Sequence, residues 1–126
     1  MFELVVEKTF AAAHFLRNFS GPCERLHGHN YRVQVYLRGS RLNEAGMLVD
    51  FTEIKAELGR ILDRFDHQCL NDLPEFDGIS PSAENIALLI GESIGRRTWG
   101  DVSSDARVDR VQVWETPIQS ATYFLS

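Results

Sequence analysis

Two stretches near the start of the chain alternate apolar and polar residues with the two-residue period of a β-strand. The first covers residues 2–14, and its even positions form a mainly apolar face that Lys8 interrupts. The second covers residues 27–38, where the odd positions are largely apolar and the even positions are polar. Because successive side chains of a strand point to opposite sides of a sheet, we expect each stretch to bury one face.

The next two periodic stretches have the spacing of helices. Apolar residues recur every three or four positions over roughly residues 51–64, and Asp50 provides a starting cap. A second helix is expected to begin at Ser80 or Ser82, with Pro81 in its first turn. Its apolar stripe consists of Ile86, Leu89, Ile90 and Ile94.

Two further strands are expected near the end of the chain. Val111, Val113 and Glu115 share one face of the first, and residues 121–125 form the second, while residues 47–49 extend a strand only briefly. The order strand, strand, helix, helix, strand, strand predicts an α+β fold with an antiparallel four-stranded sheet and two helices on one face. An open sheet of this kind has edges that need cover, so we expect a homo-oligomer.

Composition narrows the class of protein. The 126 residues are 44% hydrophobic and 25% charged, which predicts a single globular domain over residues 1–126. A net charge of -5 argues against nucleic-acid binding, and the chain has neither an apolar run long enough for a membrane nor a signal-peptide pattern. Two cysteines make no disulfide framework, so a cytoplasmic protein with free thiols is expected.

Three of the four histidines lie at strand ends. His14 ends the apolar face of the first strand, and His27 and His29 begin that of the second. If the strands pair antiparallel about the loop near Gly21, His14 lies opposite the other two. Three imidazoles would bind Zn²⁺ and leave its fourth coordination position open, where the ion could act as a Lewis acid on a bound oxygen. The alternative is that some of them are hydrogen-bonded core histidines.

Cys23 and the dipeptide Asp66-His67 are further candidates for chemistry. Cys23 could close a structural zinc site as a fourth ligand, act as a free thiolate base or nucleophile, or be an inert buried thiol. A carboxylate that orients a histidine forms an acid–base pair, but neighbours on a strand point apart, so Asp66 and His67 would need a turn. A solvated loop is the alternative for this segment.

Two glutamates complete the candidate set. Glu115 continues an inward-facing strand face, where a carboxylate needs donors, and a heterocycle with an amino group beside a ring N–H would offer two. The alternative is a strand-end glutamate that reaches solvent. Glu84, in the first turn of the second helix, could simply complement the helix dipole.

Taken together, these segments resemble the 6-pyruvoyltetrahydropterin synthase family over nearly the whole chain. The shared motifs are Phe10-Ala-Ala-Ala-His14, Cys23-x-x-x-His27-Gly-His29-Asn-Tyr31, Gly46-Met-Leu-Val-Asp50-Phe, Asp66-His67-x-x-Leu70-Asn71, Pro81-Ser-Ala-Glu84-Asn85 and Val113-Trp-Glu115-Thr116. The Cys-x3-His-Gly-His and Asp-His elements, in this order, are the specific ones.

The resemblance implies a tunnelling (T-) fold whose subunits assemble their sheets into a β-barrel, usually as a trimer or a stacked pair of trimers, and a hexamer of two trimers is expected here. It implies that His14, His27 and His29 bind zinc. It also makes Cys23 the proton-abstracting base, Asp66 with His67 the partner acid–base pair, and Glu115 the anchor of the pterin ring. In relatives these groups meet at a subunit interface.

The resemblance further implies the substrate 7,8-dihydroneopterin triphosphate, with Arg17, Arg25 and Lys8 as candidate triphosphate binders. The three-residue gap between Cys23 and His27 resembles the carboxy-forming branch of queuosine biosynthesis, which yields 6-carboxy-5,6,7,8-tetrahydropterin, triphosphate and acetaldehyde. Alternatives are the pyruvoyl-forming reaction and, through Glu24, side-chain cleavage to 6-hydroxymethyl-dihydropterin. A non-catalytic structural zinc module is the rival from another class.

Overall fold

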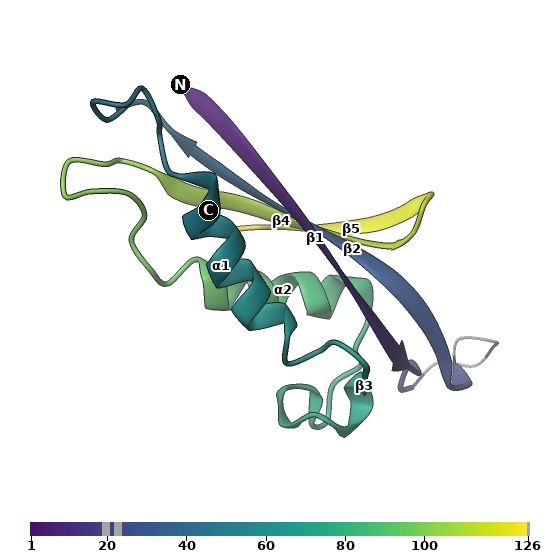
Figure 1. The fold of residues 1–126 in the computed structure, drawn as a ribbon. Helices are drawn as coiled ribbons and strands as arrows, with labels where there is room; N and C mark the ends of the chain where they lie inside the picture. The colour runs from purple at the N-terminus through teal and green to yellow at the C-terminus, as the bar shows by residue number, and fades with distance from the viewer. Residues whose placement is uncertain (19–20, 22–23, 126) are drawn as a thin grey trace.

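The structure, a computed structural model, describes residues 1–18, 21 and 24–125. One five-stranded sheet has the order β3-β1-β2-β4-β5. Two helices lie on the same side of it (Figure 1). The strands are β1 (Phe2–His14), β2 (His27–Gly39), β3 (Gln68–Cys69), β4 (Arg107–Thr116) and β5 (Gln119–Phe124), and the helices are α1 (Phe51–Leu62) and α2 (Ala83–Ile94).

The four long strands and both helices confirm the expected α+β order, but the sheet is mixed rather than wholly antiparallel. β3 is a fifth strand of two residues that pairs parallel with Ala12 and Ala13 of β1. Such a short strand has no measurable period, so its sequence reads as a polar segment. The brief strand expected over residues 47–49 is wrong, because Met47 is irregular and Leu48 and Val49 form a bend before α1.

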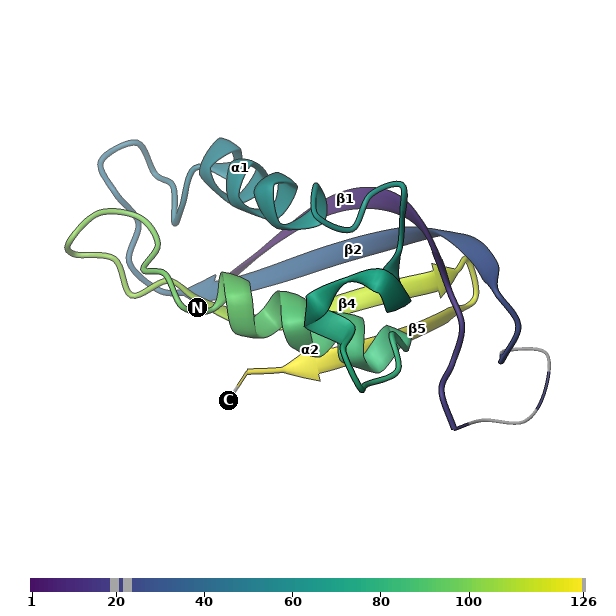
Figure 2. The ribbon, with the colours of Figure 1, turned by 90° about the horizontal axis from the view of Figure 1, so that it is seen from below.

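The core lies between the sheet and the helices. The odd positions of β2 are fully buried from Tyr31 to Leu37. In Figure 2, α1 lies along β1 and α2 lies across β4 and β5, which agrees with the contacts between these elements. Lys8 interrupts the apolar face of β1 where it passes α1 at Gly59, and a Cβ there would lie 3.3 Å from the Lys8 Nζ.

The boundaries of both helices follow from their caps. The Asp50 carboxylate accepts a hydrogen bond from the Thr52 N–H and so begins α1, as expected. Ser82, not Ser80, caps α2 by accepting from the Asn85 N–H. Pro81 therefore lies before the helix rather than in its first turn. Among the described residues, neither helix is long and apolar enough to cross a membrane.

Candidate active site

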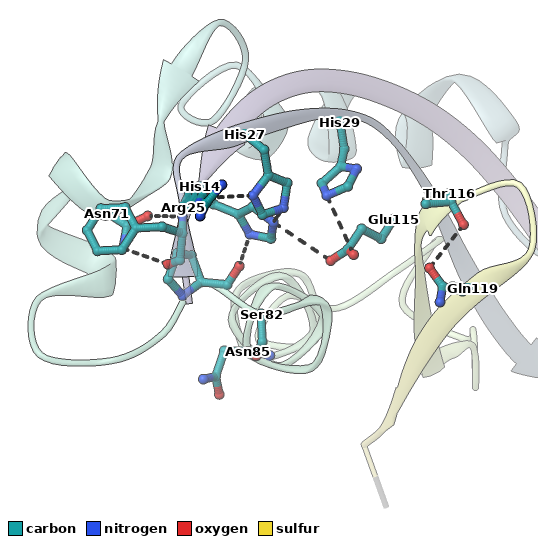
Figure 3. A network of polar contacts seen from close by, with 12 residues as sticks. His14, Arg25, His27, His29, Asn71, Ser82, Asn85, Glu115, Thr116 and Gln119 are labelled. Atoms are coloured by element: carbon teal, nitrogen blue, oxygen red, sulfur yellow. Dashed lines mark hydrogen bonds and ion pairs between the residues drawn. The ribbon is translucent and has the colours of Figure 1, made fainter. Parts of the chain in front are cut away.

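The register of β1 and β2 brings three histidines together at one end of the sheet. His14 pairs with His27, and Ala12 pairs with His29, so the antiparallel arrangement expected from sequence is confirmed. Each residue offers one ligand atom, and these atoms lie within 4.8 Å of one another. Figure 3 shows the three imidazoles facing a common space beside Glu115.

Backbone carbonyl groups fix the tautomers of two of these rings. The Nδ1 of His14 lies 2.7 Å from the Pro81 oxygen, and the Nδ1 of His27 lies 2.7 Å from the Arg25 oxygen. A carbonyl oxygen can only accept, so each Nδ1 carries the hydrogen and donates. In the neutral rings, the Nε2 atoms of His14 and His27 are therefore both bare lone pairs.

These two lone pairs point at one another. The Nε2 atoms of His14 and His27 are 3.0 Å apart, and no hydrogen lies between them when both rings are neutral. The Nε2 of His29 is also buried, and no described residue donates to it or accepts from it. A cation held between the rings removes this repulsion and gives all three nitrogens a partner. The three histidines could therefore hold a metal ion.

Burial favours the metal-binding form of two of these histidines, His14 and His29. Loss of hydration lowers the pKa values of His14 and His29 below the ordinary value, although the Pro81 carbonyl and Glu115 oppose this at His14 and Glu115 opposes it at His29. His14 is only 1% exposed. A neutral imidazole offers the lone pair that a metal needs, so the environment favours ligation over protonation.

Glu115 lies at the end of β4 beside the imidazoles. Its two carboxylate oxygens are 3.5 Å from the Nε2 of His29 and 3.9 Å from that of His14. No N–H or O–H of the described chain donates a hydrogen bond to it, so its acceptor capacity is available to a ligand. The carboxylate is 26% exposed, which places it at the edge of the core rather than fully in solvent.

A cleft beside Glu115 provides space for such a ligand. It encloses about 270 Å³ between the start of α2 and the turn that joins β4 to β5. Glu84 and Ser82 of the α2 region line it together with Glu115 and Gln119. Glu84 thus lies both in the first turn of α2, as expected, and on the wall of this cleft.

The side chains of Asp66 and His67 contact one another, as the sequence interpretation of this dipeptide requires. His67 has a φ of 59°, a left-handed conformation that supplies the required turn, and its Nδ1 lies 3.0 Å from an oxygen of Asp66. The pair is fastened to the edge of β1 because the Ala11 N–H donates to Asp66 and the His67 N–H donates to the Ala11 oxygen. The Ala11 N–H is the largest cause that lowers the pKa of Asp66.

Within the described residues, His67 and His29 line one pocket at the end of β1 and β2, but the pair is not bonded to the three imidazoles. The His67 side chain is 82% exposed, and no hydrogen bond or ion pair links it to His14, His27 or His29 among the described residues. Cys23 falls outside the described residues. Glu24 is exposed at the start of the loop segment that leads into β2.

Two of the candidate triphosphate binders have other partners. Arg17 donates through Nε to the Ile79 oxygen and through Nη2 to the Asn71 oxygen, so its guanidinium holds backbone. Lys8 packs beneath α1 at Gly59.

Asn71 and Pro81 support the end of β1, since Pro81 accepts from the His14 ring and Asn71 bonds to the Phe15 backbone. The sequence did not predict these roles, although both residues lie in the shared motifs, because contacts to backbone leave no periodic signal.

The fold and site define an α+β protein with three histidines that could hold a metal ion beside a carboxylate, and with a histidine–aspartate contact at the edge of the same sheet. Comparisons with known proteins identify the family to which this class of protein belongs. A model of the 6-pyruvoyl tetrahydropterin synthase family matches residues 3–125. The chain belongs to this family of enzymes.

Individual relatives differ in the reaction that they are named for. The 6-carboxy-5,6,7,8-tetrahydropterin synthase of Synechocystis is 35% identical over 98% of this chain and 94% of its own length. The dihydroneopterin monophosphate aldolase of Pyrococcus furiosus is 30% identical over 89% of this chain and 88% of its own length. The structure of Caenorhabditis elegans 6-pyruvoyl tetrahydropterin synthase has a TM-score of 0.84 at 30% identity, over 99% of this chain and 96% of that one. The subunit thus has the T-fold of this family.

Proposed function

We propose that this protein is a zinc-dependent lyase that acts on 7,8-dihydroneopterin triphosphate. With one water, the reaction yields 6-carboxy-5,6,7,8-tetrahydropterin, triphosphate and acetaldehyde. One observation carries the proposal. The Nε2 atoms of His14 and His27, each with a free lone pair, are 3.0 Å apart, and the Glu115 carboxylate beside them accepts no hydrogen bond within the described residues. The similarity to the Synechocystis enzyme over nearly the whole of both chains supports the carboxy-forming product.

The donor set suits zinc. Three neutral imidazoles with an open position are a common catalytic zinc ligand set, and ligands of tetrahedral zinc at about 2.0–2.1 Å lie slightly more than 3 Å apart. The separation of the His14 and His27 Nε2 atoms is already 3.0 Å. When bound, zinc supplies Lewis-acid polarisation of the substrate side-chain oxygens.

The chain's own groups would bind the substrate and move protons. Glu115 would accept hydrogen bonds from the pterin amino group and the neighbouring ring N–H, which fixes the ring in the cleft beside α2. Asp66 would hold the Nδ1–H of His67 and leave its Nε2 free to take or give a proton. Cys23 would remove a proton from the substrate side chain on the other side.

The exposed position of His67 fits a site completed by a second copy of the chain. β5 and β1 form free edges, since β3 pairs only with Ala12 and Ala13. Each of the pairs β1–β2, β2–β4 and β4–β5 is antiparallel, so β5 runs antiparallel to β1. The β5 edge of one copy could therefore extend the β1 edge of the next, and repeated addition would close a ring. We propose a homo-oligomer of this kind, as two stacked trimers.

One incubation tests the reaction. Purified zinc-loaded protein is mixed with 7,8-dihydroneopterin triphosphate, and the products are identified by mass. We expect 6-carboxy-5,6,7,8-tetrahydropterin and acetaldehyde in equal amounts, and we expect Glu115→Gln to weaken substrate binding because the amide presents an N–H donor to the ring N–H. A pyruvoyl product without acetaldehyde would overturn the branch assignment.

The relative named an aldolase supports a second candidate reaction. The Pyrococcus furiosus protein matches most of this chain, and Glu24 provides a carboxylate directly after Cys23 in the sequence. Formation of 6-hydroxymethyl-dihydropterin that Glu24→Ala abolishes, and Cys23→Ala does not, would favour this reaction. The structural zinc module predicts instead that Cys23→Ala loses zinc, whereas the enzyme keeps zinc and loses turnover.

A further inference from the structure

Asn71 is an unusual residue for the position that it occupies. It and His14 are the two polar residues found buried among the described residues, at 9% and 1% exposure. Asn71 lies in the 3₁₀ turn Leu70–Asp72 that follows β3, far along the chain from β1. A buried amide requires partners for both its oxygen and its nitrogen, and the identity of those partners indicates what it does.

Both partners of the Asn71 side chain belong to the backbone of one residue. Its Oδ1 accepts from the Phe15 N–H at 2.9 Å, and its Nδ2 donates to the Phe15 oxygen at 3.0 Å. A neighbouring strand would make the same two bonds. Phe15 is the first residue beyond the end of β1, so Asn71 replaces the missing strand directly after His14.

Further contacts hold the same short segment. The Arg17 N–H donates to the Ser80 Oγ at 2.7 Å, and this hydroxyl donates to the Arg17 oxygen at 3.2 Å. The next residue, Pro81, accepts from the Nδ1 of His14. The ring of His14 is therefore fixed through Pro81, and its backbone is fixed through Asn71 one residue further on.

We propose that Asn71 is a positioning residue that sets the location of His14 for metal binding. The inference rests on the proposed function, in which His14 is a metal ligand. His14 is the last residue of β1, and the pairing of β1 with β3 has already ended at Ala13. Without Asn71, the backbone after His14 loses two bonds, and the His14 Nε2 loses its fixed distance from the other two rings. Removing groups that support a metal ligand costs about 10–100-fold in metal affinity.

The test compares zinc affinities by competition with a chromogenic chelator. We expect Asn71→Ala to weaken zinc binding about 10–100-fold. Asn71→Asp, which keeps an oxygen for the Phe15 N–H but loses the donor to the Phe15 oxygen, should also bind more weakly. The visible spectrum of the cobalt-substituted protein should change in both variants, because it reports ligand geometry.

Asn43→Ala is the matched control. The Asn43 Oδ1 accepts from the Ala45 and Met47 N–H groups in the loop after β2, away from the histidines. Its loss also removes two bonds to backbone, so we expect some loss of stability with unchanged zinc affinity and cobalt spectrum. Thermal unfolding of the metal-free proteins measures the stability of each variant separately.

The outcomes separate this inference from the proposed function. A wild-type protein without zinc affinity would remove both. A wild-type protein that binds zinc, with equal affinity in Asn71→Ala, would overturn the positioning role alone. If Asn71→Ala does not fold, Asn71→Asp and Ser80→Ala decide the matter: wild-type zinc affinity and cobalt spectra in both would overturn it, and weakened binding in folded Asn71→Asp would support it.

Discussion

The four histidines of this chain are divided between two regions that are built in opposite ways. His14 is buried at the end of the sheet, His27 and His29 are half-buried beside it, and backbone carbonyl groups fix two of the rings. His67 lies on the surface at 82% exposure, and only its backbone and Asp66 fix it to the sheet edge. A metal site needs fixed distances between its ligands, which packing supplies. An acid–base group needs access to a substrate, and His67 has this access on the outside of the molecule.

The difference also bears on where the reaction would occur. Under the proposed function, the three histidines and the carboxylate beside them would bind metal and a pterin ring within one chain. Asp66 and His67 lie at the β1 edge of the sheet, which another copy would cover under the proposed assembly, and His67 lines a pocket there together with His29. The two regions of one chain would then serve two different sites.

The largest expected effect separates the two regions by metal content. His14→Ala should remove an interior ligand and abolish stable zinc binding, a loss greater than the about 10–100-fold expected for a supporting residue. His67→Ala should keep zinc with wild-type affinity, since its ring does not contact the cluster. Metal analysis after dialysis against a weak chelator measures both. Loss of zinc in His67→Ala would break the comparison.

A smaller effect is expected from mixing two inactive variants. His67→Ala should lower kcat by about 10²–10⁴-fold, as for loss of a general acid–base group, and His14→Ala should be inactive for want of metal. If a site combines the histidine cluster of one copy with the His67 of another, mixed oligomers contain some complete sites. Co-refolding the two variants should then restore activity well above either alone.

The control for this experiment is the double variant His14→Ala/His67→Ala co-refolded with wild type. It should only dilute the wild-type activity. Failure of the two single variants to complement one another, in mixtures that native mass spectrometry shows to be mixed oligomers, would place each site within one chain. The exposed position of His67 would then need another explanation.

The sequence predicted the three clustered histidines better than the residues that hold them in place. The two-residue period placed His14, His27 and His29 on inward faces, and the antiparallel pairing of consecutive strands brought them together. Asn71 and Pro81 were not predicted as supports because their partners are backbone groups, which every residue carries. The capping rule allowed Ser80 and Ser82 equally, but in the structure the Ser80 hydroxyl bonds to the backbone of Arg17, and Ser82 accepts from the Asn85 N–H as the cap.

The acid–base pair was predicted only as a dipeptide. A turn was required for Asp66 and His67 to face one another, and the left-handed backbone of His67 provides it. Nothing local in the sequence specifies that conformation, because it arises where the chain leaves α1 and docks on the Ala11 backbone. β3 was missed for the same reason, since two residues become a strand only through the neighbour that they meet.

The smallest expected effect is a pH dependence of stability that belongs to Asp66 alone. In the folded chain the Ala11 N–H, and then His67, hold the pKa of Asp66 below its ordinary 3.8. The unfolded chain therefore binds this proton at a higher pH than the folded chain does. The stabilisation is fully present above the unfolded pKa and is lost as the pH falls through the folded pKa.

Asp66→Asn isolates this contribution, because its amide oxygen can still accept from Ala11 but does not titrate. We expect the difference in free energy of unfolding between the metal-free wild type and Asp66→Asn to change in favour of the variant as the pH falls from about 5 to about 3. Acid also destabilises both proteins through His14 and His29, whose pKa values burial lowers, but that effect cancels in the difference. Denaturant unfolding of both proteins at each pH measures the difference in their free energies of unfolding. A difference that stays constant down to about pH 3 would mean that the Ala11 contact does not favour the charged carboxylate. The pair would then be fastened to the sheet edge by the His67 backbone alone.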